Sequence, residues 1–74
     1  MALRYIGTDN PCPNTNCPTV WVDEADDSIV IQGFKLDPQT MAEVNTTAPV
    51  QENETVVRIP ARMAAVLRGA MGDS

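Results

Sequence analysis

Short apolar runs separated by polar turns characterise most of this chain. The runs are rich in β-branched residues, which is typical of strands. We expect strands at residues 3–6, 19–22, 28–34 and 55–59. The acidic segment 23–27 joins the second run to the third, so this part of the sequence predicts a β-hairpin.

Both faces of this hairpin carry apolar residues. In the first strand Trp21 points away from its two valine neighbours. In the second strand Ile29 and Ile31 share one face, and Val30 lies on the other. Apolar residues on both faces predict a sheet that is covered twice, by a helix and by a partner chain. Gly33 indicates either a bulge or a point where another backbone comes close.

The spacing of apolar residues changes to a helical period near the end of the chain. One face of a helix over residues 60–71 carries Met63, Val66, Leu67, Ala70 and Met71. Gly72 suits the end of that helix. A second, short helix is expected over residues 37–44, because Asp37 is a favourable N-cap and Pro38 fits the first helical position.

The order of these elements predicts an α+β fold. The hairpin plus a third strand would form a small antiparallel β-sheet, packed against the C-terminal amphipathic helix. The 74 residues suit a single small domain, residues 1–74. Domains of this size often depend on a disulfide, a metal or a second subunit, and we expect a homodimer.

Both cysteines, Cys12 and Cys17, lie in a Cys/Pro-rich loop at residues 7–18. They could form a disulfide, bind a metal, or do neither. A structural zinc site usually needs four Cys or His ligands, and the chain has no histidine. Zinc would therefore require carboxylates such as Asp9, or two thiolates from each of two chains. We expect no cofactor, and zinc is the exception that the sequence leaves open.

Composition excludes several function classes. Ten acidic residues against five basic ones give a net charge of −5, which disfavours direct contact with nucleic acid. The chain has no histidine to act as a general base and no glycine-rich phosphate loop, so we expect no enzyme. It shows neither an apolar membrane span nor a signal peptide. These features predict a cytoplasmic protein, in which thiols would stay reduced.

A protein-binding surface is the function that this composition favours. Exposed aromatic and large apolar side chains are typical anchors of protein interfaces. The candidate contacts are Trp21, Ile31 and Phe34, and the acidic residues Asp26 and Asp27 would steer a basic partner. The competing hypothesis is a small domain stapled by a metal or a disulfide.

Two stretches resemble known proteins. They are residues 17–33, which run from Cys-Pro-Thr-Val-Trp-Val through an acidic turn to Ser-Ile-Val-Ile-Gln-Gly, and residues 54–60, Glu-Thr-Val-Val-Arg-Ile-Pro. Together they resemble small actinobacterial proteins of unknown function encoded beside helix-turn-helix regulators. The resemblance implies a non-enzymatic accessory protein that binds a DNA-binding transcription regulator, in an antitoxin-like pairing or in developmental regulation.

Overall fold

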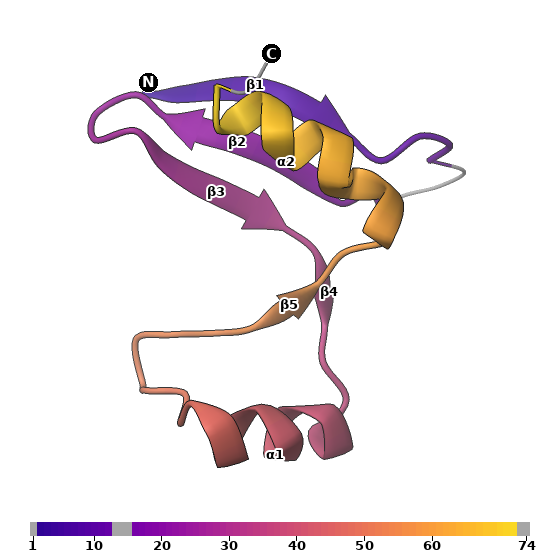
Figure 1. The fold of residues 1–74 in the computed structure, drawn as a ribbon, viewed down its shortest axis with the longest axis vertical. Coiled ribbons are helices and arrows are strands. Elements are labelled where there is room, and N and C mark those ends of the chain that lie inside the picture. Colours follow the sequence, from indigo (N-terminus) through magenta and orange to yellow (C-terminus); the bar gives the residue numbers. More distant parts are fainter. Residues whose placement is uncertain (1, 13–15, 73–74) are drawn as a thin grey trace.

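The computed structural model describes residues 2–12 and 16–72 of the chain. Its main feature is a three-stranded antiparallel sheet with the strand order β1-β2-β3 (Figure 1). The strands are β1 (Leu3–Thr8), β2 (Thr19–Asp23) and β3 (Ser28–Gln32). A C-terminal helix packs on this sheet, so the predicted α+β fold is confirmed.

The C-terminal helix consists of a 3₁₀ turn, η1 (Ala61–Met63), followed by α2 (Ala64–Ala70). It begins directly after Pro60 and ends at Ala70, with Met71 as the C-cap, so each end lies one residue inside the predicted bounds. Gly72 follows with a positive φ of 75°, a left-handed conformation that glycine adopts without strain. The apolar period, with Pro60 before it and Gly72 after it, therefore predicted this helix to within one residue at each end.

The helix packs on β1 and β2, and a glycine allows the close approach. A Cβ atom at Gly7 would lie only 3.0 Å from Cγ1 of Val66 in α2. A bulge in β1 between Tyr5 and Gly7 places Gly7 opposite Val20, on the helix side of the sheet. The apolar core between the sheet and the helix consists of Val20 and Val22 of β2 and Met63 of η1.

A second unit, which we call the arm, projects away from the sheet (Figure 1). It contains β4 (Phe34–Lys35), α1 (Pro38–Thr47) and β5 (Val57–Arg58). The strands β4 and β5 pair with each other as a separate two-stranded sheet, and α1 lies at the far end. α1 contributes no buried residue.

The third strand of the main sheet is β1, whereas the strand predicted at 55–59 pairs within the arm. Gly33 explains this arrangement. A Cβ at this position would lie 2.7 Å from the carbonyl oxygen of Arg58, so only glycine lets the chain leave β3 and pass this close to β5. Of the two alternatives that the sequence left for Gly33, the close approach of another backbone is the one observed.

Several predicted boundaries were wrong. The strand expected at 28–34 is divided at Gly33 into β3 and β4, and the strand expected at 55–59 is reduced to Val57–Arg58. β1 continues to Thr8, so the loop expected at residues 7–18 starts two residues later. The first helix reaches Thr47 rather than residue 44. Its predicted N-cap is confirmed, because the backbone N–H of Thr40 donates to Oδ2 of Asp37 at 3.1 Å.

Candidate protein-binding surface

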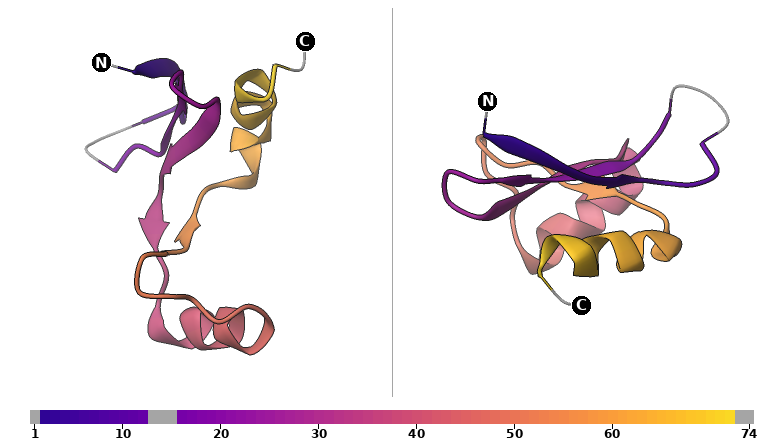
Figure 2. Two further views of the ribbon diagram at one scale, coloured as in Figure 1. Left: turned by 90° about the vertical axis from the view of Figure 1, so that its left-hand side faces the viewer. Right: turned by 90° about the horizontal axis from the view of Figure 1, so that it is seen from above.

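One side of the main sheet has no helix over it. Residues that pair across antiparallel strands lie on the same face of the sheet. Val20 and Val22, together with the residues of β1 and β3 that pair with them, therefore point toward α2. The intervening row, formed by Tyr5, Trp21 and Val30, points the other way. Figure 2 shows α2 on one side of the sheet and no helix on the opposite side, which we call the open face.

Apolar groups occupy the centre of the open face. Tyr5 is 60% exposed and Leu3, two residues earlier on the same face, is 45% exposed. Trp21 and Val30 are half-buried beside them. These four side chains, Leu3, Tyr5, Trp21 and Val30, define the apolar part of the open face. Contiguous exposed apolar groups of this kind are typical of protein-binding sites.

One end of the open face is closed by a chain of polar contacts. The hydroxyl groups of Tyr5 and Thr8 lie 2.7 Å apart, and those of Thr8 and Thr19 lie 3.2 Å apart. The Thr19 hydroxyl donates to the carbonyl oxygen of Cys17 at 2.9 Å, and the Gln32 amide donates to the same oxygen at 3.2 Å. These contacts fix the cysteine loop to the end of the sheet.

The acidic turn between β2 and β3 lies at the opposite end. Carboxylates within the turn hold its backbone, because Oδ1 of Asp23 accepts from the N–H of Ala25 and Oδ1 of Asp26 accepts from the N–H of Ser28, each at 3.0 Å. Asp27 has a positive φ of 62°, which aspartate and asparagine tolerate better than most residues.

Charge accumulates at this turn. Hydrogen bonds from the side chain and then the backbone of Ser28 lower the pKa of Asp26, so this carboxylate stays ionised at neutral pH. Glu24 is partly neutralised by Arg4, whose Nε lies 3.1 Å from Oε2 of Glu24. The charges of Asp26 and Asp27 have no such cationic partner within the described part of the chain.

The two cysteines of the loop are joined. The Sγ atoms of Cys12 and Cys17 form a disulfide, with the Cα atoms 5.6 Å apart. A disulfide was one of the three alternatives that the sequence left open. Residues 13–15 of this loop lie outside the described residues.

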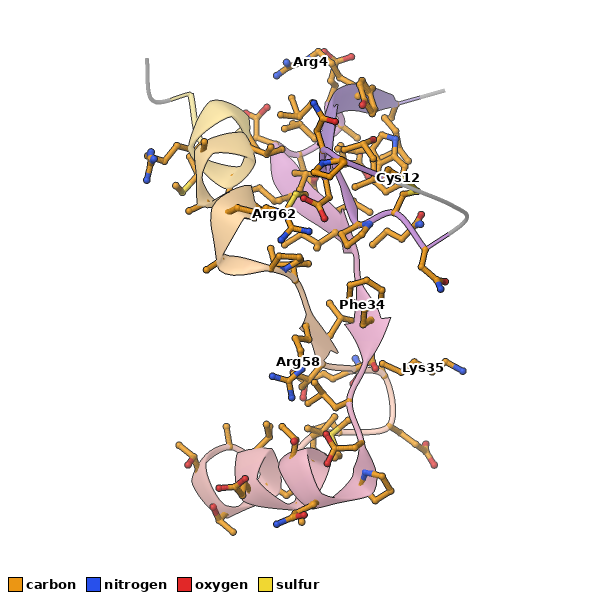
Figure 3. The ribbon with its side chains drawn as sticks, turned by 90° about the vertical axis from the view of Figure 1, so that its right-hand side faces the viewer. Arg4, Cys12, Phe34, Lys35, Arg58 and Arg62 are labelled. Atoms are coloured by element: carbon orange, nitrogen blue, oxygen red, sulfur yellow. A yellow bond between two sulfur atoms is a disulfide. The ribbon has the colours of Figure 1, made fainter. Side chains whose placement is uncertain are left out.

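An ion pair ties the same loop to the start of the C-terminal helix. Arg62 donates to both carboxylate oxygens of Asp9, from Nε to Oδ1 at 2.7 Å and from Nη2 to Oδ2 at 2.6 Å. The Arg62 side chain is 59% exposed, whereas that of Asp9 is only 7% exposed. The hydrogen bonds from Arg62 lower the pKa of Asp9 although burial opposes this shift. Figure 3 shows Arg62 reaching back from η1 toward the sheet.

The described residues contain no group of three or more His, Cys, Asp or Glu side chains that could hold a metal ion. The carboxylate of Asp9, considered above as a zinc ligand, is bound by Arg62. In the part of the chain that the structure covers, no helix has the length and apolar character needed to cross a membrane.

The five residues predicted to contact a partner do not form one surface. Trp21 lies on the open face, but Ile31 is paired with Val20 and lies on the side of α2. Phe34 belongs to the arm, where it pairs with Arg58. Asp26 and Asp27 lie together in the turn beyond the end of the open face.

A hollow of about 440 Å³ lies within the arm. It is bordered by the second half of α1 and by the segment that leads to β5. Its lining residues are Val44, Ala48, Pro49, Val50, Glu54, Thr55 and Val56. Most of these side chains are aliphatic, and no cluster of reactive groups faces the hollow.

Comparisons of the chain with protein-family models, with curated proteins and with solved structures found no match.

Sequence reasoning missed three members of the open face and the ion pair. Leu3, Tyr5 and Val30 join Trp21 only through the strand register, which includes a bulge. The alternation of Leu3 with Tyr5 was the one local signal for this. Asp9 and Arg62 are 53 positions apart, and no local pattern connects them.

Proposed function

We propose that this protein is a non-enzymatic accessory protein that binds a protein partner through the open face. The observation that supports this proposal is the apolar part of the open face, Leu3, Tyr5, Trp21 and Val30, on the side of the sheet opposite α2. A three-stranded antiparallel sheet buries apolar groups on one face and usually carries polar groups on the other. Here the second face is apolar at its centre, as a surface that a partner covers would be.

The side chains of this face suit protein recognition. Tyrosine and tryptophan offer large apolar area at a low cost in side-chain entropy, and they are enriched among the residues that dominate interface energetics. Trp21 is half-buried between two strands, so its ring is held in place before a partner arrives. Such a pre-organised surface loses little conformational entropy on binding.

The charge of the molecule favours a basic partner. The net charge is −5, and the acidic turn with Asp26 and Asp27 adjoins one end of the open face. Acidic groups beside an apolar patch raise the association rate with a basic protein. A DNA-binding transcription regulator of the helix-turn-helix class, which the resemblance implies, is a partner of this kind, and we propose it as the target.

The experiment is a capture from host extract with the tagged chain, comparing the wild type with Leu3→Thr/Tyr5→Thr. Both residues are exposed and threonine favours strands, so this variant removes apolar area from the open face and loses only the hydrogen bond between Tyr5 and Thr8. Val57→Thr is the matched control, because Val57 is an exposed strand residue of the arm. We expect the double variant to lose at least about tenfold in affinity, equivalent to about 1.4 kcal/mol, and the control to bind like the wild type.

Equal loss in both variants would contradict a site on the open face. Recovery of a basic DNA-binding protein by the wild type and by Val57→Thr supports the proposed target. Recovery of the bait alone contradicts the accessory function.

The contribution of the acidic turn can be tested without changing its shape. In Asp26→Asn/Asp27→Asn, the amide oxygen still accepts from Ser28, and asparagine tolerates the positive φ at position 27. We therefore expect a slower association rate and a weaker dependence on salt, with dissociation nearly unchanged. Surface plasmon resonance at low and high ionic strength separates these effects. An unchanged association rate at low salt would contradict steering.

A second candidate role rests on the disulfide. Cys12 and Cys17 close the loop of residues 12–17, and Asp9, the partner of Arg62, lies three residues before Cys12, so the bond would act as a staple next to the contact between the sheet and the helix. Replacing both cysteines with serine should lower the free energy of unfolding by about 2 kcal/mol, the amount expected for a loop this short. An unchanged melting temperature in oxidising buffer would leave the staple without a role.

The predicted cytoplasmic location belongs to the proposal of an accessory protein and is an alternative to the staple. Glutathione in that compartment would reduce the disulfide between Cys12 and Cys17 to thiols. Alkylation of intact cells before lysis, followed by mass spectrometry of the loop peptide, determines whether the two cysteines are thiols or a disulfide in the cell. Alkylated thiols support a cytoplasmic protein, and an intact disulfide contradicts it.

A further inference from the structure

A second hollow lies on the α2 side of the main sheet, and we call it the end hollow. Its volume is about 500 Å³, within the range of roughly 300–1,000 Å³ that is usual for ligand sites. Figure 1 shows that α2 ends at the same end of the sheet as the turn between β2 and β3. The hollow lies there, lined by Arg4, Val22, Asp27, Ile29, Ala70, Met71 and Gly72.

The sheet and the helix each supply apolar surface to the end hollow. Arg4, Val22 and Ile29 pair across the three strands, so they form one row on the α2 side of the sheet. Val22 is buried, whereas Ile29 beside it is 38% exposed. Met71, the C-cap of α2, is 63% exposed. The uncovered side chains of Ile29 and Met71 therefore border a space that suits an aliphatic chain.

The two charged residues of the end hollow differ in how far they are neutralised. Arg4 donates from Nε to Oε2 of Glu24 at 3.1 Å, so its charge already has a partner. Asp27 forms no ion pair, and its carboxylate accepts no hydrogen bond from the residues that the structure describes. The charge without a partner is negative, and it attracts a cation.

The end of α2 adds to this preference for a cation. The last carbonyl groups of a helix lack partners within the helix and carry a partial negative charge. Hydrogen bonds from Met71 and Gly72 satisfy the carbonyl oxygens of residues 67–69. Among the described residues, no N–H group donates to the carbonyl oxygens of Ala70 and Met71, which border the hollow. Acceptors are thus available from the helix as well as from the turn.

We propose that the end hollow binds a lysine side chain of a basic protein. The four-carbon stem would lie against Ile29 and Met71, and the ammonium group would donate to Asp27 and to the carbonyl groups at the end of α2. Lysine suits separate acceptors better than arginine, because its three N–H donors diverge, whereas the planar guanidinium group matches a single carboxylate. The net charge of −5 favours the approach of such a partner.

This site goes beyond the proposed function and does not depend on it. It lies on the α2 side of the sheet, and the apolar part of the open face lies on the opposite side. Asp27 is common to the site and to the steering of a partner. A probe the size of one amino acid separates the two roles, because it cannot reach the open face from the hollow. Each proposal can therefore fail without the other.

The experiment is an NMR titration of the labelled chain with N-acetyl-lysine methylamide at low ionic strength. N-acetyl-norleucine methylamide, which has a four-carbon side chain without the ammonium group, is the matched control probe. We expect the lysine probe to shift the methyl signals of Ile29 and Met71 and the amide signal of Asp27. It should bind about threefold more tightly than the norleucine probe, the size of effect that an exposed charge pair gives. Equal binding of the two probes, or no shift of these signals, overturns the proposal.

Two further probes test the chemistry of the ligand. N-acetyl-arginine methylamide should bind more weakly than the lysine probe, and tighter binding of arginine contradicts the choice of lysine. N-acetyl-glutamate methylamide should not shift the signals of Ile29 and Met71. Shifts with the glutamate probe that exceed those with the lysine probe would contradict a cation site.

Two variants of the turn separate this site from the general charge of the molecule. Asp27→Asn and Asp26→Asn each remove one negative charge from the same turn, but only Asp27 lines the hollow. Asparagine tolerates the positive φ at position 27, and at position 26 it still accepts from Ser28. We expect Asp27→Asn to bind the lysine probe no more tightly than the norleucine probe, and Asp26→Asn to bind it nearly like the wild type. Equal losses in the two variants contradict the site.

A third variant tests the sign of the ligand charge. Arg4→Gln removes the cation from the hollow and leaves Glu24 without its partner. The lysine probe should then bind about twofold more tightly than it binds the wild type, as expected for the loss of a nearby like charge at the surface. Weaker binding of the lysine probe to Arg4→Gln would contradict a cation held by Asp27.

Discussion

The sheet with α2 and the arm are built in different ways. The apolar core, Val20, Val22 and Met63, belongs to the sheet and its helix. The arm has a two-residue ladder and a ten-residue helix with no buried residue. Isolated helices of this length are marginal in water. Stability is therefore concentrated in one unit, and the other depends on local contacts.

Those local contacts are polar. Asp37 caps α1, and hydrogen bonds from the side chain and then the backbone of Thr40 lower the pKa of the Asp37 carboxyl. Arg58 of β5 reaches both groups, with Nη2 3.4 Å from the hydroxyl oxygen of Thr40 and 3.8 Å from Oδ1 of Asp37. All of these side chains are half-buried or exposed, and exposed pairs contribute little to stability.

The largest expected effect follows from the core. Met63→Ala should lower the free energy of unfolding by about 2–5 kcal/mol, because it leaves a cavity under α2. Val44→Ala removes a half-buried side chain from α1 and should cost less than about 1 kcal/mol. Chemical denaturation measures both. If Met63→Ala does not fold, the free energy of unfolding can be measured for Met63→Leu, which conserves the volume of the side chain. Equal losses for Met63→Ala and Val44→Ala would contradict the comparison.

A second prediction concerns the junction between the two units. Gly33→Ala places a Cβ 2.7 Å from the carbonyl oxygen of Arg58, so β4 and β5 must separate, at a cost of about 1–3 kcal/mol. Gly69→Ala is the control, because its Cβ would meet only Cγ2 of Ile6, at an ordinary 3.6 Å. Alanine in α2 should leave stability unchanged or raise it. Amide exchange should accelerate in the arm of Gly33→Ala and not in its main sheet.

The smallest effect is a change in acid sensitivity. The folded-state pKa of Asp9 is lowered by Arg62, so the stability that this carboxylate contributes is present above its unfolded pKa of about 3.9. It is lost as the pH falls through the lower folded pKa. Asp9→Asn should melt below the wild type at neutral pH, and the difference should shrink below about pH 4. A difference that stays constant with pH would contradict an ionised Asp9.

Much of this fold follows from local sequence. The apolar residues near the C-terminus repeat with a helical period, and Asp37-Pro38 begins a helix in the expected way. Alternation also separated Trp21 from the two valines that became the core. Each of these predictions depends on residues a few positions apart, where backbone geometry decides which side chains share a face.

The rest depended on long-range pairing. Nothing local distinguishes β1 from the strand at 55–59 as the third strand of the main sheet. The choice depends on the reversal after β1, where the N–H of Asp9 donates to the carbonyl oxygen of Pro18 at 2.8 Å and a disulfide closes the loop. Arg62 joins Asp9 only once that loop is formed. The candidate surface was predicted through Trp21 alone, because the register supplies the other three residues.

The most direct test of the open face as a binding surface is NMR of the labelled chain with its unlabelled captured partner. We predict shifts of the Leu3 and Val30 methyl signals and of the Trp21 indole signal, while the methyl signals of Val44 and Val57 in the arm stay in place. Shifts confined to the arm, with the Leu3, Trp21 and Val30 signals unchanged, would contradict the account.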